Sequence, residues 1–106
     1  MTRGEIYWVD LDPPAGRRPV CVVTRARAAS VLTGIVCAPI TRTIRGIRSE
    51  VPVGPAQGLP DESVINCDTV ITVAKDQLSG DAVGRLDLRA TIQLDQALRY
   101  ALDIRW

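Results

Sequence analysis

The spacing of its apolar runs is the feature that most limits how this chain can fold. Short runs rich in valine, isoleucine and aromatic residues recur from the N-terminus onward, and glycine, proline or other turn residues separate them. We expect strands at 5–11, 19–24, 33–40, 49–53 and 63–73, of which the last is the longest. We also expect a mixed connector at 25–30, a basic loop or edge hairpin at 41–48 and a loop at 54–60.

A helix is predicted only at the end of the chain. Asp87 is a residue type that favours a helix N-cap, and apolar side chains follow it at helical spacing, at Leu94, Ala97, Leu98, Ala101 and Leu102. We interpret Trp106 as a hydrophobic anchor for this helix. Short strands followed by one terminal helix predict a mainly β fold with a C-terminal α-helix, built as an SH3-like small barrel in a single domain, 1–106.

Composition narrows the class of protein. The 106 residues are 46% hydrophobic, which is typical of a globular chain. No apolar run approaches the ~20 residues that span a bilayer, and the first residues do not resemble a signal peptide, so a cytoplasmic protein without membrane contact is expected. The cysteines, Cys21, Cys37 and Cys67, lie in apolar runs and are interpreted as buried thiols. Because the chain has no histidine, it lacks the commonest metal ligand and the usual base near pH 7, and we expect no metal or other cofactor.

Positive charge is concentrated in one segment, although the net charge of the chain is only +1. Between residues 17 and 48 every charged residue is an arginine: Arg17, Arg18, Arg25, Arg27, Arg42, Arg45 and Arg48. A basic segment on an otherwise neutral domain suggests a local anionic partner, while a solvated basic loop is the alternative for the three arginines after Thr41.

The stretch 16–24 joins a turn to a strand of buried type. Pro19 fits the first position of a strand and biases Arg18 toward extended backbone, so the Arg18 side chain should leave the sheet from a fixed base. A fork-shaped guanidinium held in this way suits a phosphate, and a solvated pair with Arg17 is the alternative. Thr41 follows Pro39 at the end of the third strand and should be exposed there.

Two further pairs of residues are informative because side chains alternate along a strand. Tyr7 and Trp8 are neighbours in the first strand, so only one can face the core and the other is freer to stack on a base. Asn66 and Asp68 flank Cys67 within the predicted 63–73 strand and should share the face opposite to it.

Several blocks of this sequence together resemble a known family. They are Arg3–Pro13, Arg18-Pro19-Val20, Ala38-Pro39-Ile40-Thr41, Asn66-Cys67-Asp68 and Gly84-Arg85-Leu86. In this order and spacing, and with the terminal helix, they resemble the MazF/PemK toxin endoribonucleases over nearly the whole chain. The resemblance implies a toxin of a type II toxin–antitoxin system that forms a homodimer and cleaves single-stranded RNA (mRNA, tRNA or rRNA) within a short sequence motif. It also implies a cognate antitoxin whose tail covers the RNA groove.

The resemblance assigns roles to individual residues. The positions of Arg18 and Thr41 hold the catalytic pair of the family, and Asp68 matches an acidic position implicated in some members. We expect RNA contacts from Arg17, Arg42, Arg45, Arg48, Asn66 and Asp68. Two departures from the family pattern are a shortened first loop, 14–17, which bears on cleavage specificity, and Asn66, which stands where some members have an arginine.

The expected chemistry is metal-independent transesterification, in which the 2′-OH attacks the adjacent phosphorus and leaves 2′,3′-cyclic phosphate and 5′-OH ends. Arg18 would stabilise the charge on the phosphorane, and Thr41 would bond a phosphate oxygen or orient the 2′-OH. Asp68 is expected to be the only acid near this pair, with a structural carboxylate as its alternative role. Two other classes stay open, a gyrase-directed toxin of the CcdB type and a non-catalytic SH3-like binding module.

Overall fold

The computed structural model describes residues 1–14 and 16–105, so the prediction for Trp106 lies outside the described residues. The strands are β1 (Glu5–Asp10), β2 (Arg17–Val22), β3 (Gly34–Thr41), β4 (Glu50–Val53), β5 (Ser63–Asn66), β6 (Ile71–Ala74) and β7 (Leu78–Arg85). The helices are the one-turn α1 (Ala26–Ala29) and the longer α2 (Leu88–Ala101), with 3₁₀ turns η1 (Pro55–Gln57), η2 (Cys67–Thr69) and η3 (Lys75–Gln77). The predicted mainly β fold with a C-terminal helix is confirmed.

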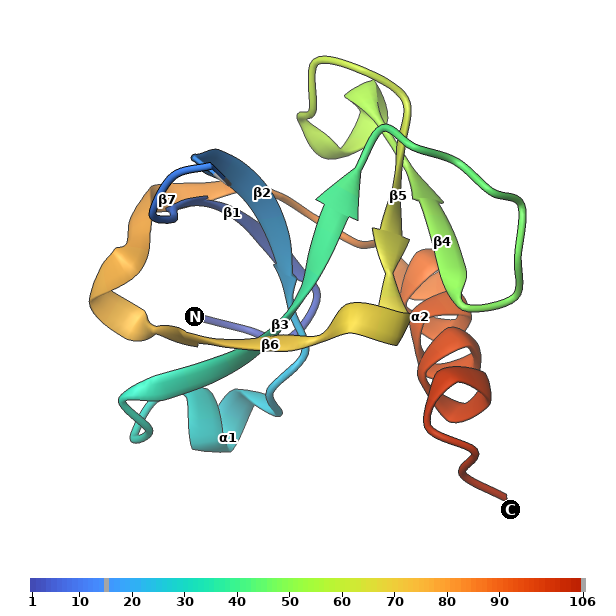
Figure 1. Ribbon diagram of the computed structural model, residues 1–106. Helices are drawn as coiled ribbons and strands as arrows, with labels where there is room; N and C mark the ends of the chain where they lie inside the picture. The colour runs from blue at the N-terminus through green and yellow to red at the C-terminus, as the bar shows by residue number, and fades with distance from the viewer. Residues whose placement is uncertain (15, 106) are drawn as a thin grey trace.

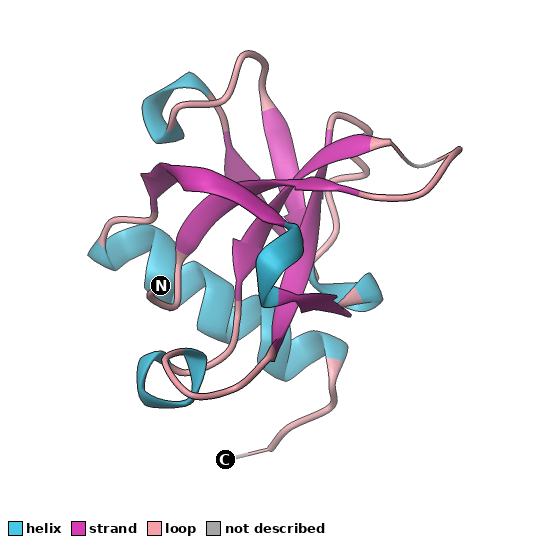
Figure 2. Cartoon of the chain, turned by 90° about the vertical axis from the view of Figure 1, so that its left-hand side faces the viewer, coloured by secondary structure: helices cyan, strands magenta, loops and turns pink. Residues whose placement is uncertain are grey.

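All strand pairs are antiparallel, in the order β4-β5-β3-β2-β1-β7, with β6 also paired to β3. The sheet curls into a half-barrel, and α2 covers one side of it (Figure 1). Turned by 90°, the molecule shows its strands crossing in front of the long helix (Figure 2). The start of β2 and the end of β3 lie at the same end of the curled sheet.

Two apolar clusters hold the sheet in place, one on each of its faces. Cys21 of β2 packs into the cluster that includes Leu94 of α2, while Val20 and Val22 pack into the cluster inside the curl. Because successive side chains of a strand point to opposite faces, a strand buried on both faces needs an unbroken apolar run. This explains why β2 reads as Val-Cys-Val in the sequence.

The C-terminal helix begins where the sequence predicts. The Asp87 carboxylate accepts a hydrogen bond from the Ala90 backbone N–H at 2.8 Å, as an N-cap does. Leu94, Ala97 and Leu98 are buried as expected. Leu102 is 55% exposed, because the helix ends at Ala101 and the next residue leaves the buried stripe.

Two predicted elements are wrong in detail, and one strand was not predicted. The expected strand at 63–73 is broken into β5, η2 and β6. The Asn66 side chain accepts the Asp68 N–H at 2.9 Å, and a side chain that bonds its own backbone in this way competes with a sheet ladder. The connector 25–30 contains α1, and β7 was not predicted at all.

Candidate functional site

A groove of about 870 Å³ opens where β2 begins and β3 ends. The β2–β3 ladder runs from Val22–Cys37 to Val20–Pro39 and stops there. Pro19 and Pro39 have no N–H to donate to the β2–β3 ladder. Beyond them β2 stays paired with β1 and β3 with β5, while the groove opens between β2 and β3. Prolines that the sequence places at strand ends thus lie where the sheet opens.

Arg18 and Thr41 both line this groove. If the β2–β3 register is continued past its last pair, Arg18 falls opposite Thr41. The Arg18 side chain is exposed and makes no hydrogen bond or ion pair within the described part of the chain. The Thr41 hydroxyl oxygen accepts the Thr43 backbone N–H at 3.1 Å, which leaves its O–H free to donate. The structure therefore brings together a free guanidinium and a free hydroxyl donor on one surface.

Two more arginines border the groove, and each is held by a carboxylate. Arg17 lies 3.5 Å from Asp10 across the β1–β2 ladder, and Arg42 lies 3.5 Å from Asp61. All four side chains are mostly exposed, so each pair contributes little stability and can exchange its carboxylate for another anion. The lining residues are Trp8, Leu11, Arg17, Arg18, Pro19, Val20, Pro39, Ile40, Thr41, Arg42, Thr43, Leu59, Pro60, Asp61, Ser63 and Ile71.

The loop that carries Leu59 and Asp61 to the groove is pinned against β7. A Cβ on Gly84 would lie 2.0 Å from the Gln57 carbonyl oxygen, so only glycine permits this approach. Gly58 has a positive φ of 87° and sits against the Val83 carbonyl in the same way. The Gln57 side chain also accepts the Gly54 N–H at 2.7 Å. The groove wall is thus fixed by residues far away in the sequence.

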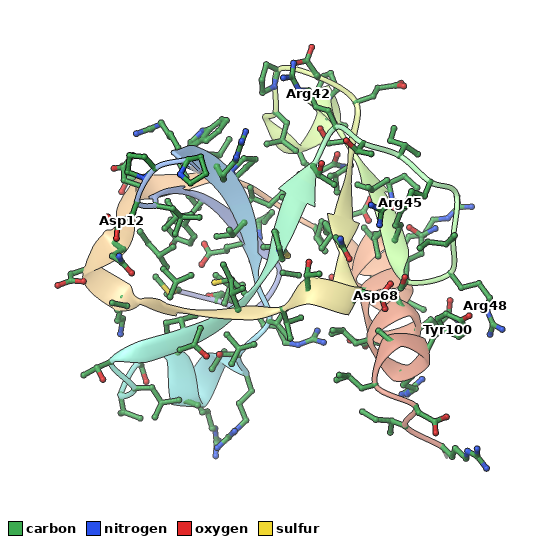
Figure 3. The ribbon with its side chains drawn as sticks, in the orientation of Figure 1. Asp12, Arg42, Arg45, Arg48, Asp68 and Tyr100 are labelled. Atoms are coloured by element: carbon green, nitrogen blue, oxygen red, sulfur yellow. The ribbon has the colours of Figure 1, made fainter. Side chains whose placement is uncertain are left out.

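The other predicted RNA-binding residues lie away from this groove (Figure 3). The segment after Arg42 runs down toward α2, where Arg48 stacks on Tyr100 with 4.5 Å between its guanidinium carbon and the ring centroid. Asp68 accepts a hydrogen bond from the buried Ser49 hydroxyl at 2.5 Å, and Asn66 caps η2. Arg45, Arg48, Asn66 and Asp68 are not among the residues that line the groove.

The expectation that Asp68 is the only acid near Arg18 and Thr41 is wrong. Asp61, and not Asp68, is the carboxylate that lines the groove with Arg18 and Thr41. No periodicity or motif in the sequence connects Asp61 with those residues, since the loop that carries it is placed by its contact with β7. The expectation that Asn66 and Asp68 share a strand face is also wrong, because η2 replaces the strand.

The cysteines are confirmed as free, buried thiols. The pKa of Cys21 is raised to about 12, mainly by burial and to a smaller extent by electrostatic interaction with the nearby Cys37 and Cys67. Cys21 therefore stays a thiol at neutral pH. Among residues 1–14 and 16–105 no three histidine, cysteine or acidic side chains gather as metal ligands would. The described helices include none that is long and apolar enough to cross a membrane.

Comparison with known proteins identifies the class that this fold and groove belong to. The family model of the PemK-like, MazF-like toxins of type II toxin–antitoxin systems matches residues 2–102. The chain therefore belongs to the PemK/MazF toxin family, the first of the three classes that the sequence left open.

Individual relatives agree with this assignment. Endoribonuclease MazF3 of Mycobacterium tuberculosis is 38% identical over 89 residues, which cover 84% of this chain and 85% of that protein. The solved Mycobacterium tuberculosis toxin MazF-mt6 superimposes with a TM-score of 0.87 at 36% identity, covering 96% of this chain and 99% of the other. A mycobacterial endoribonuclease solved in complex with its cognate antitoxin has a TM-score of 0.87 at 30% identity, covering 100% of this chain and 98% of the other.

Proposed function

We propose that this endoribonuclease of the MazF family cleaves single-stranded RNA in the groove between β2 and β3. The observation that carries the proposal is the meeting of Arg18 and Thr41 in a groove bordered by Arg17 and Arg42. Three arginines line the groove, and Asp10 and Asp61 pair with Arg17 and Arg42, so one positive charge remains in excess, which suits a polyanion. The similar proteins that are named endoribonucleases support the same activity.

Arg18 and Thr41 act on the phosphate that is cleaved. Among the described residues the Arg18 guanidinium has no carboxylate partner to displace, and it donates charge-assisted hydrogen bonds to the phosphate oxygens. It neutralises the charge that develops when the phosphorus becomes five-coordinate. The Thr41 O–H, whose oxygen is already occupied by the Thr43 N–H, donates to a phosphate oxygen and orients the ribose beside it.

The nucleophile in this proposal comes from the substrate. The chain has no histidine, and its described residues form no carboxylate cluster of the kind that binds metal ions to activate water. The ribose 2′-OH already lies beside the phosphorus. The 2′-oxygen forms a bond to phosphorus as the bond to the 5′-oxygen breaks, the 2′-OH loses its proton, and the leaving oxygen gains one. The products are a 2′,3′-cyclic phosphate and a 5′-hydroxyl.

The test uses labelled single-stranded RNA with purified protein in EDTA. We expect cleavage to continue, with a cyclic phosphate upstream and a 5′-hydroxyl downstream. A single 2′-deoxy substitution at the nucleotide 5′ to the cut should abolish cleavage and spare binding, while the same substitution elsewhere serves as the matched control. A 5′-phosphate on the downstream fragment, or activity restored only by magnesium, would contradict this chemistry.

Partners follow from the same proposal. We propose that a cognate antitoxin binds over the groove, as supported by a similar mycobacterial endoribonuclease solved with its own antitoxin. We also propose a homodimer. The outer face of α2 exposes Leu88 and Ile92, one helical turn apart, which is the kind of apolar surface that a second copy can cover. Light scattering on the purified chain measures the mass directly.

A further inference from the structure

One aromatic residue in the groove is not used by the proposed chemistry. Trp8 lines the groove with a half-buried side chain, whereas its neighbour Tyr7 is buried inside the curl of the sheet. The alternation predicted from the sequence is confirmed, and the structure assigns the core position to Tyr7. The indole is thus available at the surface that holds Arg18 and Thr41.

The Arg17 side chain lies over the Trp8 ring and also pairs with Asp10. The guanidinium carbon of Arg17 lies over the indole, 5.4 Å from the ring centroid. Arg17 is also directly opposite Asp10 in the β1–β2 ladder and pairs with it at 3.5 Å. Asp10 and Trp8 are two residues apart in β1, so their side chains share a face. The indole and the Asp10 carboxylate, which lie on one face of β1, therefore both contact the Arg17 guanidinium.

We propose that the Trp8–Arg17 pair is the stacking platform for the nucleobase that adjoins the scissile phosphate. This inference rests on the proposed function of the groove. Aromatic rings and guanidinium planes are the groups on which proteins stack single-stranded bases, and here both occur together. Trp8, Arg17 and Arg18 all line the same groove, so the platform and the guanidinium assigned to the phosphate can contact one bound strand of RNA. A base and the phosphate next to it thus find matching groups in one groove.

A second arginine–aromatic pair in the molecule provides a matched control. Arg48 lies over Tyr100 at 4.5 Å, but the hollow around them is lined by two arginines and two acidic residues, together with glutamines of α2. It contains neither Arg18 nor Thr41. The platform is distinguished from this pair by its place beside the phosphate-binding donors.

The test measures the binding of RNA that is made uncleavable by one 2′-deoxy nucleotide at the cut. In a series of such RNAs, a single abasic nucleotide is placed at successive positions along the strand. On the parent protein, one abasic position next to the cut should weaken binding roughly 10- to 100-fold, the range for loss of one stacked base. Trp8→Leu, which keeps an apolar side chain but removes the ring, should weaken binding of intact RNA by the same factor. The affinity of the Trp8→Leu variant should then not change when the abasic nucleotide is placed next to the cut. Trp8→Phe should recover most of the loss, and Tyr100→Leu should behave as the parent.

The outcomes separate this inference from the proposed function. If the parent does not cut RNA at all, the proposed function fails. If the parent cuts RNA but no abasic position near the cut weakens its binding, the platform is overturned whatever the variants do. The same conclusion follows if folded Trp8→Leu, verified by its thermal melt, loses as much affinity at that abasic position as the parent does.

Discussion

Two hollows on this molecule each hold an arginine stacked on an aromatic ring, and they differ in charge and in construction. The groove at Arg18 lies between the ends of strands β2 and β3 and has three arginines against one aspartate. The hollow at Tyr100 lies between the edge strand β4 and helix α2, and its two arginines face two acidic residues. The stacked pair alone therefore does not mark an RNA site. The groove at Arg18 differs in its excess positive charge and in a guanidinium that has no carboxylate partner among the described residues, and on these features we base the proposal of an RNA site.

The largest effect should come from the donor that has no carboxylate partner. Arg18→Ala should lower the cleavage rate roughly 100- to 1,000-fold, the usual effect of removing one donor that stabilises developing charge. Arg99→Ala, in the balanced hollow, is the control and should cut as the parent does. Single-turnover rates and thermal melts are measured together. If folded Arg18→Ala cleaved RNA at the parental rate, Arg18 would not belong to the site. The proposed functional difference between the two hollows would then be wrong.

The Thr41 hydroxyl should have the next largest effect. Thr41→Ala removes one hydrogen bond to a charged group and should slow cleavage roughly 10- to 100-fold. Thr41→Ser keeps the hydroxyl and should stay within a few-fold of the parent. Equal activity of the serine and alanine variants would show that the hydroxyl makes no contact in the transition state.

Salt dependence of binding tells how far the RNA extends along the basic segment. Arg42→Ala should flatten the slope of log affinity against log salt by about 0.7, the value for one lost single-strand phosphate contact. Arg45→Ala and Arg48→Ala test the sequence-based prediction for those residues, and we expect smaller decreases because they lie outside the groove. Decreases as large as that of Arg42→Ala would show that RNA runs on to the hollow beside α2.

The smallest effect should come from the acid on the groove wall. Asp61→Asn removes a carboxylate that is paired with Arg42 at 3.5 Å, and exposed pairs of this kind contribute at most about 1 kcal/mol. RNA binding should tighten by less than about five-fold, because Arg42 is freed and one negative charge is lost. Asp103→Asn, in the balanced hollow, should leave RNA affinity unchanged. A cleavage rate lowered more than ten-fold by Asp61→Asn would instead make this carboxylate part of the chemistry.

Local patterns were sufficient for the elements whose residues all favour one structure. The strands around Val9, Val20 and Cys37 were predicted to within a few residues, because β-branched and apolar residues fill them and turn residues end them. The terminal helix was predicted because its cap and its buried stripe agree. The positions of Arg18 and Thr41 near strand ends followed from the neighbouring prolines. Arg18 is exposed as expected, whereas Thr41 is half-buried.

Elements were missed where the local pattern is weak or competes with another. β7 contains Gly80, Asp81 and Gly84, which disfavour strands, and it is a strand because β1 offers an edge to pair with. The run at 63–73 is apolar enough for one strand, yet the Asn66 side chain captures the Asp68 N–H and bends the chain. Whether β7 forms therefore depends on β1, a strand that is distant in the sequence. Whether 63–73 forms one strand depends on a side-chain hydrogen bond that competes with the sheet.

By itself the sequence determined the first strands, the terminal helix and the two donors, Arg18 and Thr41, near strand ends, since each of these depends on neighbouring residues. Only the tertiary structure decided which groups surround those donors. Asp61 enters the groove because Gly84 lets the Gln57 carbonyl approach β7, and Asp68 is kept out by its bond to Ser49. Trp8 faces the groove, and not the core, because Tyr7 fills the curl of the sheet. These are contacts between distant segments, and they form only once the sheet has curled.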